Sequence, residues 1–408
     1  MTEADNPVGS AGQSGGRPQG ASGGHAALSS ADLVIVGGGV MGLWAAVKAG
    51  RLGLRTLLLE ARAPGHGASG GLLGALMPHM PDRWNDKKQF QFDALLQLEE
   101  EVAAIEAETR LSCGYRRVGR YIPLPKPHLA VIAERHSIEA GTNWHQQGQA
   151  FHWHLMKTSP IDGWPDAAFT EAGLVHDTFA ARVFPRSLCA GLVAVIRATP
   201  HVDLVEGAAV AGIDPVLGRV TLESGETIGF GHCIVAAGHR AFPLIEGLDA
   251  GDLQRKPLGQ PVKGQAALLA AAIDPAFPVI FLNGLYVVAH EGGHVAIGST
   301  SEEEFDAPFS TDDKLDDLIF RARALVPGLA DAPVIERWAG LRPKAIDRDP
   351  MVGPHPRHPS VISLAGGFKV SFGLAHRLAD AALAGIVGKP VDLPSSFTLA
   401  HHLSVAAQ

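Results

Sequence analysis

Three glycines and one acid near the amino terminus have the types and spacing of a dinucleotide site. Gly37, Gly39 and Gly42 follow the apolar run LVIV in the order G-x-G-x-x-G, and Glu60 ends a second apolar run. In this pattern the first glycine permits a sharp turn, the second lets a pyrophosphate approach the backbone, and the third lets a helix pack close to the strand. A carboxylate at the end of the second strand accepts hydrogen bonds from the ribose hydroxyls. A glycine-rich turn without a ligand is the alternative, but it leaves Glu60 unexplained.

Two later glycine turns repeat this pattern in a weaker form. An apolar strand ends at Ala236 and is followed by Ala237 and Gly238, where a nucleotide can pass close to the sheet edge. A simple turn at a strand end has the same composition. Gly366 and Gly367 lie between another apolar strand and an amphipathic helix, whose first turn can stabilise negative charge.

Histidines suggest a metal at two places, and we expect a metal at neither. His152 and His154 would share one face of a strand, but no carboxylate or thiol nearby completes a closed site. His290 and His294 have the spacing of a zinc-protease helix, yet the two glycines between them disfavour a helix. Three widely separated cysteines indicate neither a disulfide framework nor a metal site, and they fit a reducing compartment.

The elements around these residues alternate between strand and helix. The dinucleotide segment is predicted to form a strand over 33–36, a helix over 40–49 and a strand over 54–59. Apolar residues at helical spacing predict further helices over 93–109, 129–140, 311–325 and 372–387. Between 258 and 326 the pattern becomes a β-meander, with Asn283-Gly284 and Gly292-Gly293 as hairpin turns.

Composition limits the class of protein. A chain of 408 residues with 46% apolar residues is long enough for two or three domains with real cores. The net charge of −8 and the lack of a Lys and Arg cluster argue against nucleic acid as the main partner. Residues 1–30 are mostly Gly, Ser, Ala, Gln and Pro, so we expect a disordered leader without signal-peptide character. No apolar run is long enough for a membrane span, and we expect a soluble, cytoplasmic protein.

Four segments together resemble the FAD-dependent amine and amino-acid oxidases of the D-amino-acid oxidase superfamily, which includes glycine oxidase, sarcosine oxidase and D-amino-acid dehydrogenase. These segments are VIVGGGVMG with Glu60, the strand end IVAAG, the pair YVVAH and GGHVAIGST, and WAGLRPKAIDRDPMVG followed by AGGFKVSFGLAH. They span nearly all of the chain after the leader, in the right order. The loop GASGGLLGALMP is also similar to the FAD domain of a bifunctional tRNA-modifying enzyme, which we take as a sign of chemistry on N-substituted glycines.

The resemblance implies one FAD, bound noncovalently, with its pyrophosphate at the first glycine turn. The residues that it implies for the cofactor are Gly37, Gly39, Val40, Met41, Gly42, Glu60, Ala68, Ser69, Gly70, Val210, Ala237, Gly238, Gly366, Gly367, Phe368, Lys369, Val370, Ser371 and Phe372. Two positions depart from the family pattern. Ser371 replaces a glycine, and Lys369 with Val370 replaces the usual aromatic or Arg/Asn pattern.

For the substrate, the resemblance implies that Arg342 holds a carboxylate and that Tyr286 lines the same pocket. Lys369 is a candidate second cation of the pocket, or a solvated side chain. A structural ion pair of Arg342 with Asp347 or Asp349 is the alternative to its binding role.

The reaction implied is transfer of a hydride from the carbon next to the amine nitrogen to the flavin, giving an imine that water hydrolyses. The substrate would be glycine, an N-substituted glycine or a D-amino acid, and oxygen or another acceptor would reoxidise the flavin. A 2-hydroxy-acid oxidase or dehydrogenase is the alternative, although we see no clear base for it in the sequence. A flavin-binding protein without turnover is a further alternative.

The fold expected is α/β, with a Rossmann-like FAD domain in discontinuous segments and a substrate domain built on an antiparallel sheet. We assign 31–112, 168–255 and 338–392 to the FAD domain, 113–167 and 256–337 to the substrate domain, and 393–408 to a C-terminal tail.

Overall fold

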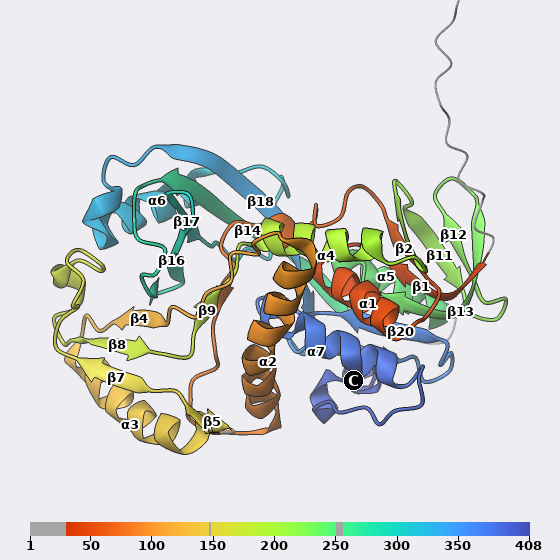
Figure 1. Cartoon of the computed structure of the whole chain (residues 1–408), viewed down its shortest axis with the longest axis horizontal. Helices are drawn as coiled ribbons and strands as arrows, with labels where there is room; N and C mark the ends of the chain where they lie inside the picture. The colour runs from red at the N-terminus through yellow and green to blue at the C-terminus, as the bar shows by residue number, and fades with distance from the viewer. Residues whose placement is uncertain (1–29, 147, 250–255) are drawn as a thin grey trace, which may run out of the picture.

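The computed structural model describes residues 30–146, 148–249 and 256–408, and two lobes are visible along its long axis (Figure 1). One lobe is built on a largely parallel sheet and the other on a largely antiparallel sheet, with α2 (Asp86–Thr109) between them. The predicted leader lies outside the described residues except for Ser30.

The first sheet contains the dinucleotide segment at its centre. Its parallel strands lie in the order β10 (Val202–Glu206), β2 (Thr56–Glu60), β1 (Ser30–Val36), β13 (Thr227–Val235) and β20 (Val361–Ala365). Three antiparallel strands extend it, β11 (Val210–Asp214), β12 (Arg219–Leu222) and β19 (Met351–Pro354). The carboxyl ends of β1, β2 and β13 therefore meet at one edge, where open α/β sheets bind ligands.

Helices cover both faces of this sheet because its central strand is apolar on both sides. Leu33 and Ile35 of β1 pack into one core, whereas Val34 and Val36 pack into another. The first core includes residues of α1 (Val40–Arg51), α2, α4 (Pro185–Ala198) and α7 (Ser371–Ala384). The second includes residues of α5 (Ala241–Glu246) and α8 (Leu399–Ala406). Burial on both faces explains why the part of β1 from Leu33 to Val36 contains no polar residue.

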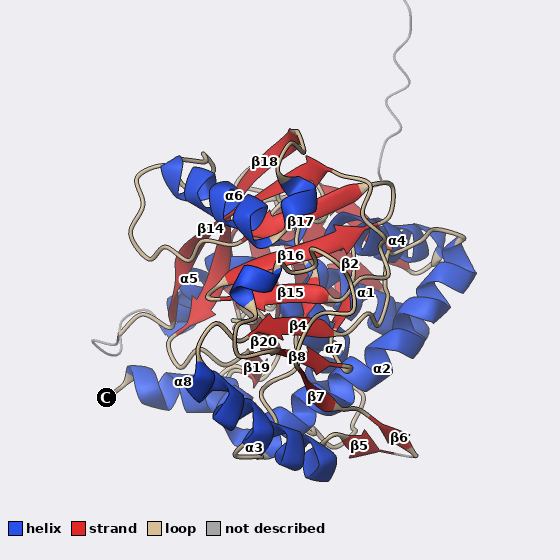
Figure 2. Ribbon diagram, turned by 90° about the vertical axis from the view of Figure 1, so that its left-hand side faces the viewer, coloured by secondary structure: helices blue, strands red, loops and turns tan. Residues whose placement is uncertain are grey.

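The second sheet has eight strands, seen stacked in Figure 2. Their order is β18 (Val334–Ala345), β14 (Gly259–Ala270), β17 (His294–Gly298), β16 (Leu285–His290), β15 (Val279–Leu282), β4 (Arg120–Pro123), β8 (Leu174–Asp177) and β7 (Trp153–Met156). Every neighbouring pair is antiparallel except β15 and β4. Helix α6 (Asp313–Leu325) packs on β14, β16 and β17, and α3 (Pro127–Asn143) packs on β7. Short strand pairs complete the fold, β3 (Ala75–Leu76) with β9 (Ala181–Arg182), and β5 (His145–Gln146) with β6 (Gln149–Ala150).

Both predicted hairpin turns are confirmed. Asn283 and Gly284 join β15 to β16 with positive φ angles of 48° and 82°. Gly292 and Gly293 join β16 to β17, again with positive φ, and this pairs His290 with His294 across the hairpin rather than along a helix. Asn and Gly favour such turns because they tolerate the left-handed region.

The helix predicted at Asp93 begins earlier, at Asp86. The side chain of Asn85 accepts hydrogen bonds from the backbone N–H groups of Lys87 and Lys88 and so caps α2. The apolar pattern did not reveal this turn because its residues, DKKQ, are polar. The other predicted helices, over 129–140, 311–325 and 372–387, differ from α3, α6 and α7 by a few residues at their ends.

The domain boundaries stay a prediction. Strand β8 lies in the second sheet although the predicted FAD segment 168–255 includes it, and β18 crosses position 338. Within the described residues, no helix has the length and apolar character that crossing a bilayer requires.

Candidate active site

A cavity of about 990 Å³ extends between the two sheets and receives residues from both. Its wall includes Glu60 and Val210 from the first sheet and Tyr286 and Arg342 from the second. Ligand pockets span about 300–1,000 Å³, so this volume is large enough for a long cofactor.

The turn after β1 is closed to side chains at two positions and open at the third. A Cβ atom on Gly37, whose φ is +105°, would lie 2.6 Å from the carbonyl oxygen of Ala236. A Cβ on Gly42 would lie 1.8 Å from the carbonyl oxygen of Gly37. Gly39 faces the cavity, and the nearest atom to a Cβ there is Ser69 Oγ at 3.4 Å. The turn therefore exposes backbone to the cavity, as a pyrophosphate site requires.

Ser69 places a hydroxyl at the start of α1. Its Oγ accepts a hydrogen bond of 2.9 Å from the backbone N–H of Val40 and is buried. The first turn of α1 contains no acidic residue. The positive end of the helix dipole and the Ser69 hydroxyl proton are thus both available to an anion at this point of the cavity.

The carboxylate of Glu60 is held in place by backbone. Its Oε2 accepts from the N–H of Gly38 at 2.7 Å, and its Oε1 accepts from the N–H of Arg62 at 2.9 Å. Each oxygen keeps a second lone pair, and Glu60 lines the cavity. This arrangement fits the two hydroxyls of a ribose.

Most of the residues expected at the cofactor line this one cavity. Those from the sheet edge and the following turns are Gly37, Gly39, Val40, Met41, Glu60, Ala68, Ser69, Val210, Ala237 and Gly238. Those from the turn before α7 are Phe368, Lys369, Val370, Ser371 and Phe372. The remaining four, Gly42, Gly70, Gly366 and Gly367, pack against backbone or side chains instead. A Cβ on Gly367, for example, would lie 2.2 Å from Met41 Cε. The glycine cradle, the held carboxylate and the cavity volume together fit FAD.

Arg342 is a half-buried cation without an acidic partner among the described residues. Its Nη1 donates to Ser299 Oγ at 3.0 Å and its Nη2 to the carbonyl oxygen of Thr300, while Nε has no partner there. Asp347 and Asp349 pair with His401 and Lys87 instead, so the ion-pair alternative for Arg342 is wrong. Burial lowers the pKa of Arg342 to about 10, which still leaves it charged at neutral pH. A cation that lines a cavity and has no acidic partner is a candidate site for an anion.

Lys369 adds a second cation beside Arg342. Lys369 Nζ lies 5.4 Å and Arg342 Cζ lies 5.6 Å from the centre of the Phe368 ring. Burial, and then the nearby Arg342, lowers the pKa of Lys369. Lys369 lines the cavity but is an exposed residue, so its role as a second cation of the pocket stays a prediction beside the alternative of a solvated side chain.

Tyr286 lies on the wall between cationic groups. Its ring packs against that of Phe281, its partner on β15, with ring centres 4.7 Å apart. Burial raises the pKa of Tyr286, while the charges of Arg120 and Arg342 lower it. The phenol therefore stays neutral and can donate a hydrogen bond to a bound ligand.

Several residues that line the cavity were not expected from the sequence, among them His79, Arg120 and Trp338. His79 directly follows the segment GASGGLLGALMP, which we call the glycine-rich loop. Burial lowers the pKa of the His79 imidazole. Arg120 belongs to no motif, whereas Trp338 is the first residue of the segment WAGLRPKAIDRDPMVG, to which only Arg342 was assigned a role. Their role depends on which strands of the second sheet become neighbours.

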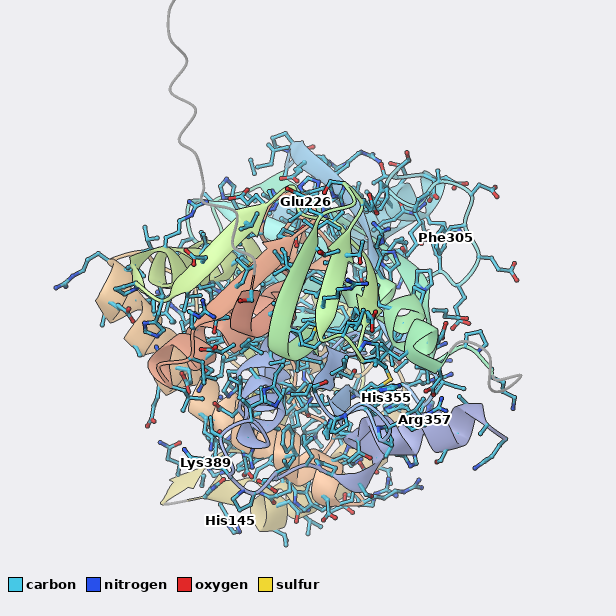
Figure 3. All side chains as sticks on the ribbon, turned by 90° about the vertical axis from the view of Figure 1, so that its right-hand side faces the viewer. His145, Glu226, Phe305, His355, Arg357 and Lys389 are labelled. Atoms are coloured by element: carbon cyan, nitrogen blue, oxygen red, sulfur yellow. The ribbon has the colours of Figure 1, made fainter. Side chains whose placement is uncertain are left out.

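A cluster of Asp249, His355 and His358 lies outside the cavity. The potential ligand atoms are within 4.8 Å of one another, and His355 is labelled next to Arg357 in Figure 3. The guanidinium of Arg357 pairs with the Asp249 carboxylate and already supplies a cation. We therefore assign no metal to this cluster.

Comparisons with known proteins agree with this geometry. The chain matches the family described as FAD dependent oxidoreductase over residues 32–381. Glycine oxidase of Pseudomonas aeruginosa is 29% identical over 346 residues, which cover 79% of this chain and 86% of that protein. The tRNA 5-methylaminomethyl-2-thiouridine biosynthesis bifunctional protein MnmC of Chromohalobacter salexigens is 27% identical over 349 residues, which cover 79% of this chain and 45% of that protein.

A solved structure extends the likeness to the fold. The crystal structure of glycine oxidase from Geobacillus kaustophilus superposes with a TM-score of 0.80 at 22% identity, covering 91% of this chain and 98% of the other. The expected fold class and the expected FAD are confirmed by these matches.

Proposed function

Since this chain belongs to the family of FAD-dependent oxidoreductases, we propose that it oxidises a small amine that carries a carboxylate. Glycine, an N-substituted glycine and a D-amino acid are the candidate substrates. The observation that carries the proposal is Arg342, a half-buried cation that lines the cavity and has no acidic partner among the described residues. A substrate carboxylate would provide the missing anion in a charge-assisted hydrogen bond.

Three side chains of the cavity wall and one helix end have separate roles in this reaction. Arg342 and Lys369 bind and orient the carboxylate, which fixes the adjacent carbon relative to the cofactor. Tyr286 donates a hydrogen bond and excludes water from one side of the substrate. The first turn of α7, which begins at Ser371, favours negative charge at the end of the cavity next to it.

FAD, when bound, supplies the acceptor for the hydride. The carbon next to the nitrogen loses this hydride, the neutral amine loses a proton, and the C=N bond that forms is hydrolysed by water to a carbonyl compound and an amine. The two electrons then pass to oxygen or to another acceptor. No strong protein base is needed if the amine binds in its neutral form.

Arg342→Ala tests the proposal. We expect kcat/KM for carboxylate-bearing amines to fall by roughly 100-fold or more, because removing one partner of a buried charge pair costs about 2–5 kcal/mol. The bound flavin should remain, since the hydrogen bonds of Arg342 go to Ser299, Thr300 and Lys263 and to none of the residues expected at the cofactor. Arg337→Ala is the matched control, because Arg337 lies on the same strand but pairs with Asp316 at the surface. Equal loss of flavin and activity in Arg342→Ala would show that Arg342 is structural.

Oxidation of a 2-hydroxy acid is a second candidate, and His79 favours it. This imidazole lines the cavity and burial lowers its pKa, so it is neutral and able to take a hydroxyl proton. Anaerobic addition of substrates separates the two reactions. Bleaching of the flavin by amines supports the proposed function, whereas bleaching only by hydroxy acids supports the second.

A further inference from the structure

The loop between β17 and α6 has both of its ends held by β14. Gln265 of β14 is completely buried, and its Nε2 donates to Glu302 Oε1 at 2.9 Å and to Asp312 Oδ1 at 2.7 Å. Its Oε1 accepts from the backbone N–H of Asp312 at 2.9 Å. Lys263 of the same strand pairs with Asp312 at 3.1 Å and exchanges backbone hydrogen bonds with Glu302. Residues 303–311 therefore leave β14 and return to it at one place, as in a compact surface loop.

The middle of this loop is held by few contacts. Glu303 pairs with Lys344 of β18, but residues 304–311 form no hydrogen bond within the part of the chain that the structure describes. The loop turns at Pro308 and Phe309, and proline favours the first central position of such a turn. A segment with few contacts opens at a small cost in free energy. The loop can therefore move between its two fixed ends.

Phe309 extends from this loop to the nucleotide end of the cavity. Its side chain lines the cavity, and the centre of its ring lies 5.9 Å from Arg62 Cζ. Arg62 follows Glu60 by two residues, and its backbone N–H donates to the Glu60 carboxylate. A loop whose ends are fixed to the second sheet thus reaches the carboxylate of the first sheet that fits a ribose.

The ring of Phe309 is free to contact a ligand. The side chain is 59% exposed, so the contact with Arg62 covers only part of it. A single exposed apolar side chain is common, but this ring forms part of a cavity wall beside the position expected for the ribose. Adenine is attached to that ribose, and its flat face stacks on aromatic side chains. The guanidinium of Arg62 attracts the ring and so favours its position at this end of the cavity.

We propose that Phe309 covers the adenosine of bound FAD, and that the loop 303–311 retains the cofactor from the side of the second sheet. The glycine turn and Glu60 then hold the nucleotide from the first sheet, and Phe309 closes over it. Gln265 is a positioning residue, because it fixes both ends of the loop that presents the ring. The inference concerns FAD, which follows from the family, and it holds whichever substrate is oxidised.

Release of FAD from the purified holoprotein provides the first test. The holoprotein is diluted, and the fluorescence of free flavin is followed with time. We expect Phe309→Ala to release FAD about 10-fold faster than the wild type, because loss of the stacked ring raises the dissociation rate. Phe309→Tyr keeps an aromatic ring and should stay within about threefold of the wild type. Equal release rates for the wild type and Phe309→Ala would overturn the proposal.

Phe320→Ala is the matched control for this measurement. Phe320 is 73% exposed and lies on α6, directly after the loop, but it does not line the cavity. Its replacement should leave the release of FAD unchanged. Because Phe309 is itself largely exposed, Phe309→Ala should fold as the wild type does, which its melting temperature without FAD checks.

The two halves of the cofactor show where the ring acts. ADP contains the adenosine and pyrophosphate of FAD, whereas FMN contains the flavin without the adenosine. Each is added up to millimolar concentration in competition with FAD for the stripped full-length chain. We expect Phe309→Ala to weaken ADP by about 10-fold and FMN by less than about threefold. An equal inhibition constant of ADP for the wild type and the variant, or an equal loss for ADP and FMN, would overturn contact with the adenosine.

A double-mutant cycle tests the role of Gln265. Gln265→Ala frees the ends of the loop and should accelerate FAD release by about 10-fold in the wild-type background. In the Phe309→Ala background the same substitution should change release by less than about twofold, because the ring that it positions is already absent. Additive effects of the two substitutions would show that Gln265 acts on the fold instead, and would overturn its role in positioning Phe309.

Discussion

At the scale of residues, the site depends on groups whose charge state is set by burial. Arg342 stays charged although burial lowers its pKa to about 10. His290 shows the opposite outcome, because burial lowers its pKa to about 4 and keeps its imidazole neutral. The Nε2 of His290 lies 3.1 Å from the carbonyl oxygen of Leu73, which belongs to the cavity wall. This hydrogen bond therefore connects the glycine-rich loop to β16 of the second sheet.

The neutral His290 predicts a loss of stability in acid. The ordinary pKa of 6.5 is lowered in the folded state, so the unfolded chain binds more protons and stability falls as pH decreases from about 6.5 toward 4. His290 alone should account for about 3 kcal/mol by pH 4. His290→Gln keeps a donor for Leu73 but does not titrate, so its free energy of unfolding should depend less on pH. Urea unfolding of both proteins at several pH values measures this, and parallel curves would contradict it.

Gly264 on β14 makes room for the guanidinium of Arg342. A Cβ there would lie 2.6 Å from Arg342 Nη2 and 2.7 Å from Cζ. Gly264→Ala should displace this flexible side-chain end rather than the backbone. We expect KM for a carboxylate-bearing amine to rise about 10-fold, equivalent to about 1.4 kcal/mol, with little change in melting temperature. Gly212→Ala, where nothing lies within 4 Å of the new Cβ, is the control, and an unchanged KM in Gly264→Ala would refute the prediction.

At the scale of elements, the position of α1 relative to β1 decides whether a cofactor can approach the backbone. Gly42 sits in the first turn of α1, and the close contact with the carbonyl oxygen of Gly37 fixes the helix against the strand end. The Ser69 hydroxyl then meets the exposed start of the helix. This local unit needs no other part of the chain to present its donors.

Gly42→Ala should therefore cost both stability and cofactor. The new Cβ would lie 1.8 Å from a backbone oxygen, so the helix has to move away from the strand. We expect at least a 10-fold loss of FAD affinity and a destabilisation of about 1–3 kcal/mol. The ratio of flavin to protein after purification, and the Kd on reconstitution, provide the measurement. Gly141→Ala in α3, which meets no atom within 4 Å, should retain wild-type flavin content.

At the scale of the whole molecule, the cavity joins the two lobes. Arg186 of α4 pairs with Glu336 of β18 and also donates to the carbonyl oxygen of Gly70 at 2.8 Å, so it connects α4, β18 and the glycine-rich loop. A ligand that fills the cavity adds further contacts to both sheets. A ligand that binds only the folded state therefore raises the free energy of unfolding of the holoprotein above that of the protein without ligand.

Removal of FAD should lower the melting temperature. At a free FAD concentration of 100 times Kd, the holoprotein gains about 2.7 kcal/mol over the stripped protein. Calorimetry of the stripped protein with increasing FAD should show a melting temperature that rises continuously with concentration. A melting temperature independent of added FAD would mean that the cofactor does not bind the folded state.

The sequence by itself determined the nucleotide end of this protein. Gly37, Gly39, Gly42 and Glu60 lie within one strand-helix-strand unit, and turn sterics and helix geometry act over such short separations. The hairpin turn at Asn283 and Gly284 was readable for the same reason.

Only the tertiary structure decided how the cationic end of the cavity is assembled. Arg120, Tyr286 and Arg342 come from β4, β16 and β18, and their common wall depends on the parallel pairing of β4 with β15. The partner of a buried charge is likewise set by packing, since Asp347 and Asp349 lie near Arg342 in sequence yet pair elsewhere. Pairing between distant strands follows from the free energy of the whole fold, which no short pattern of residues encodes.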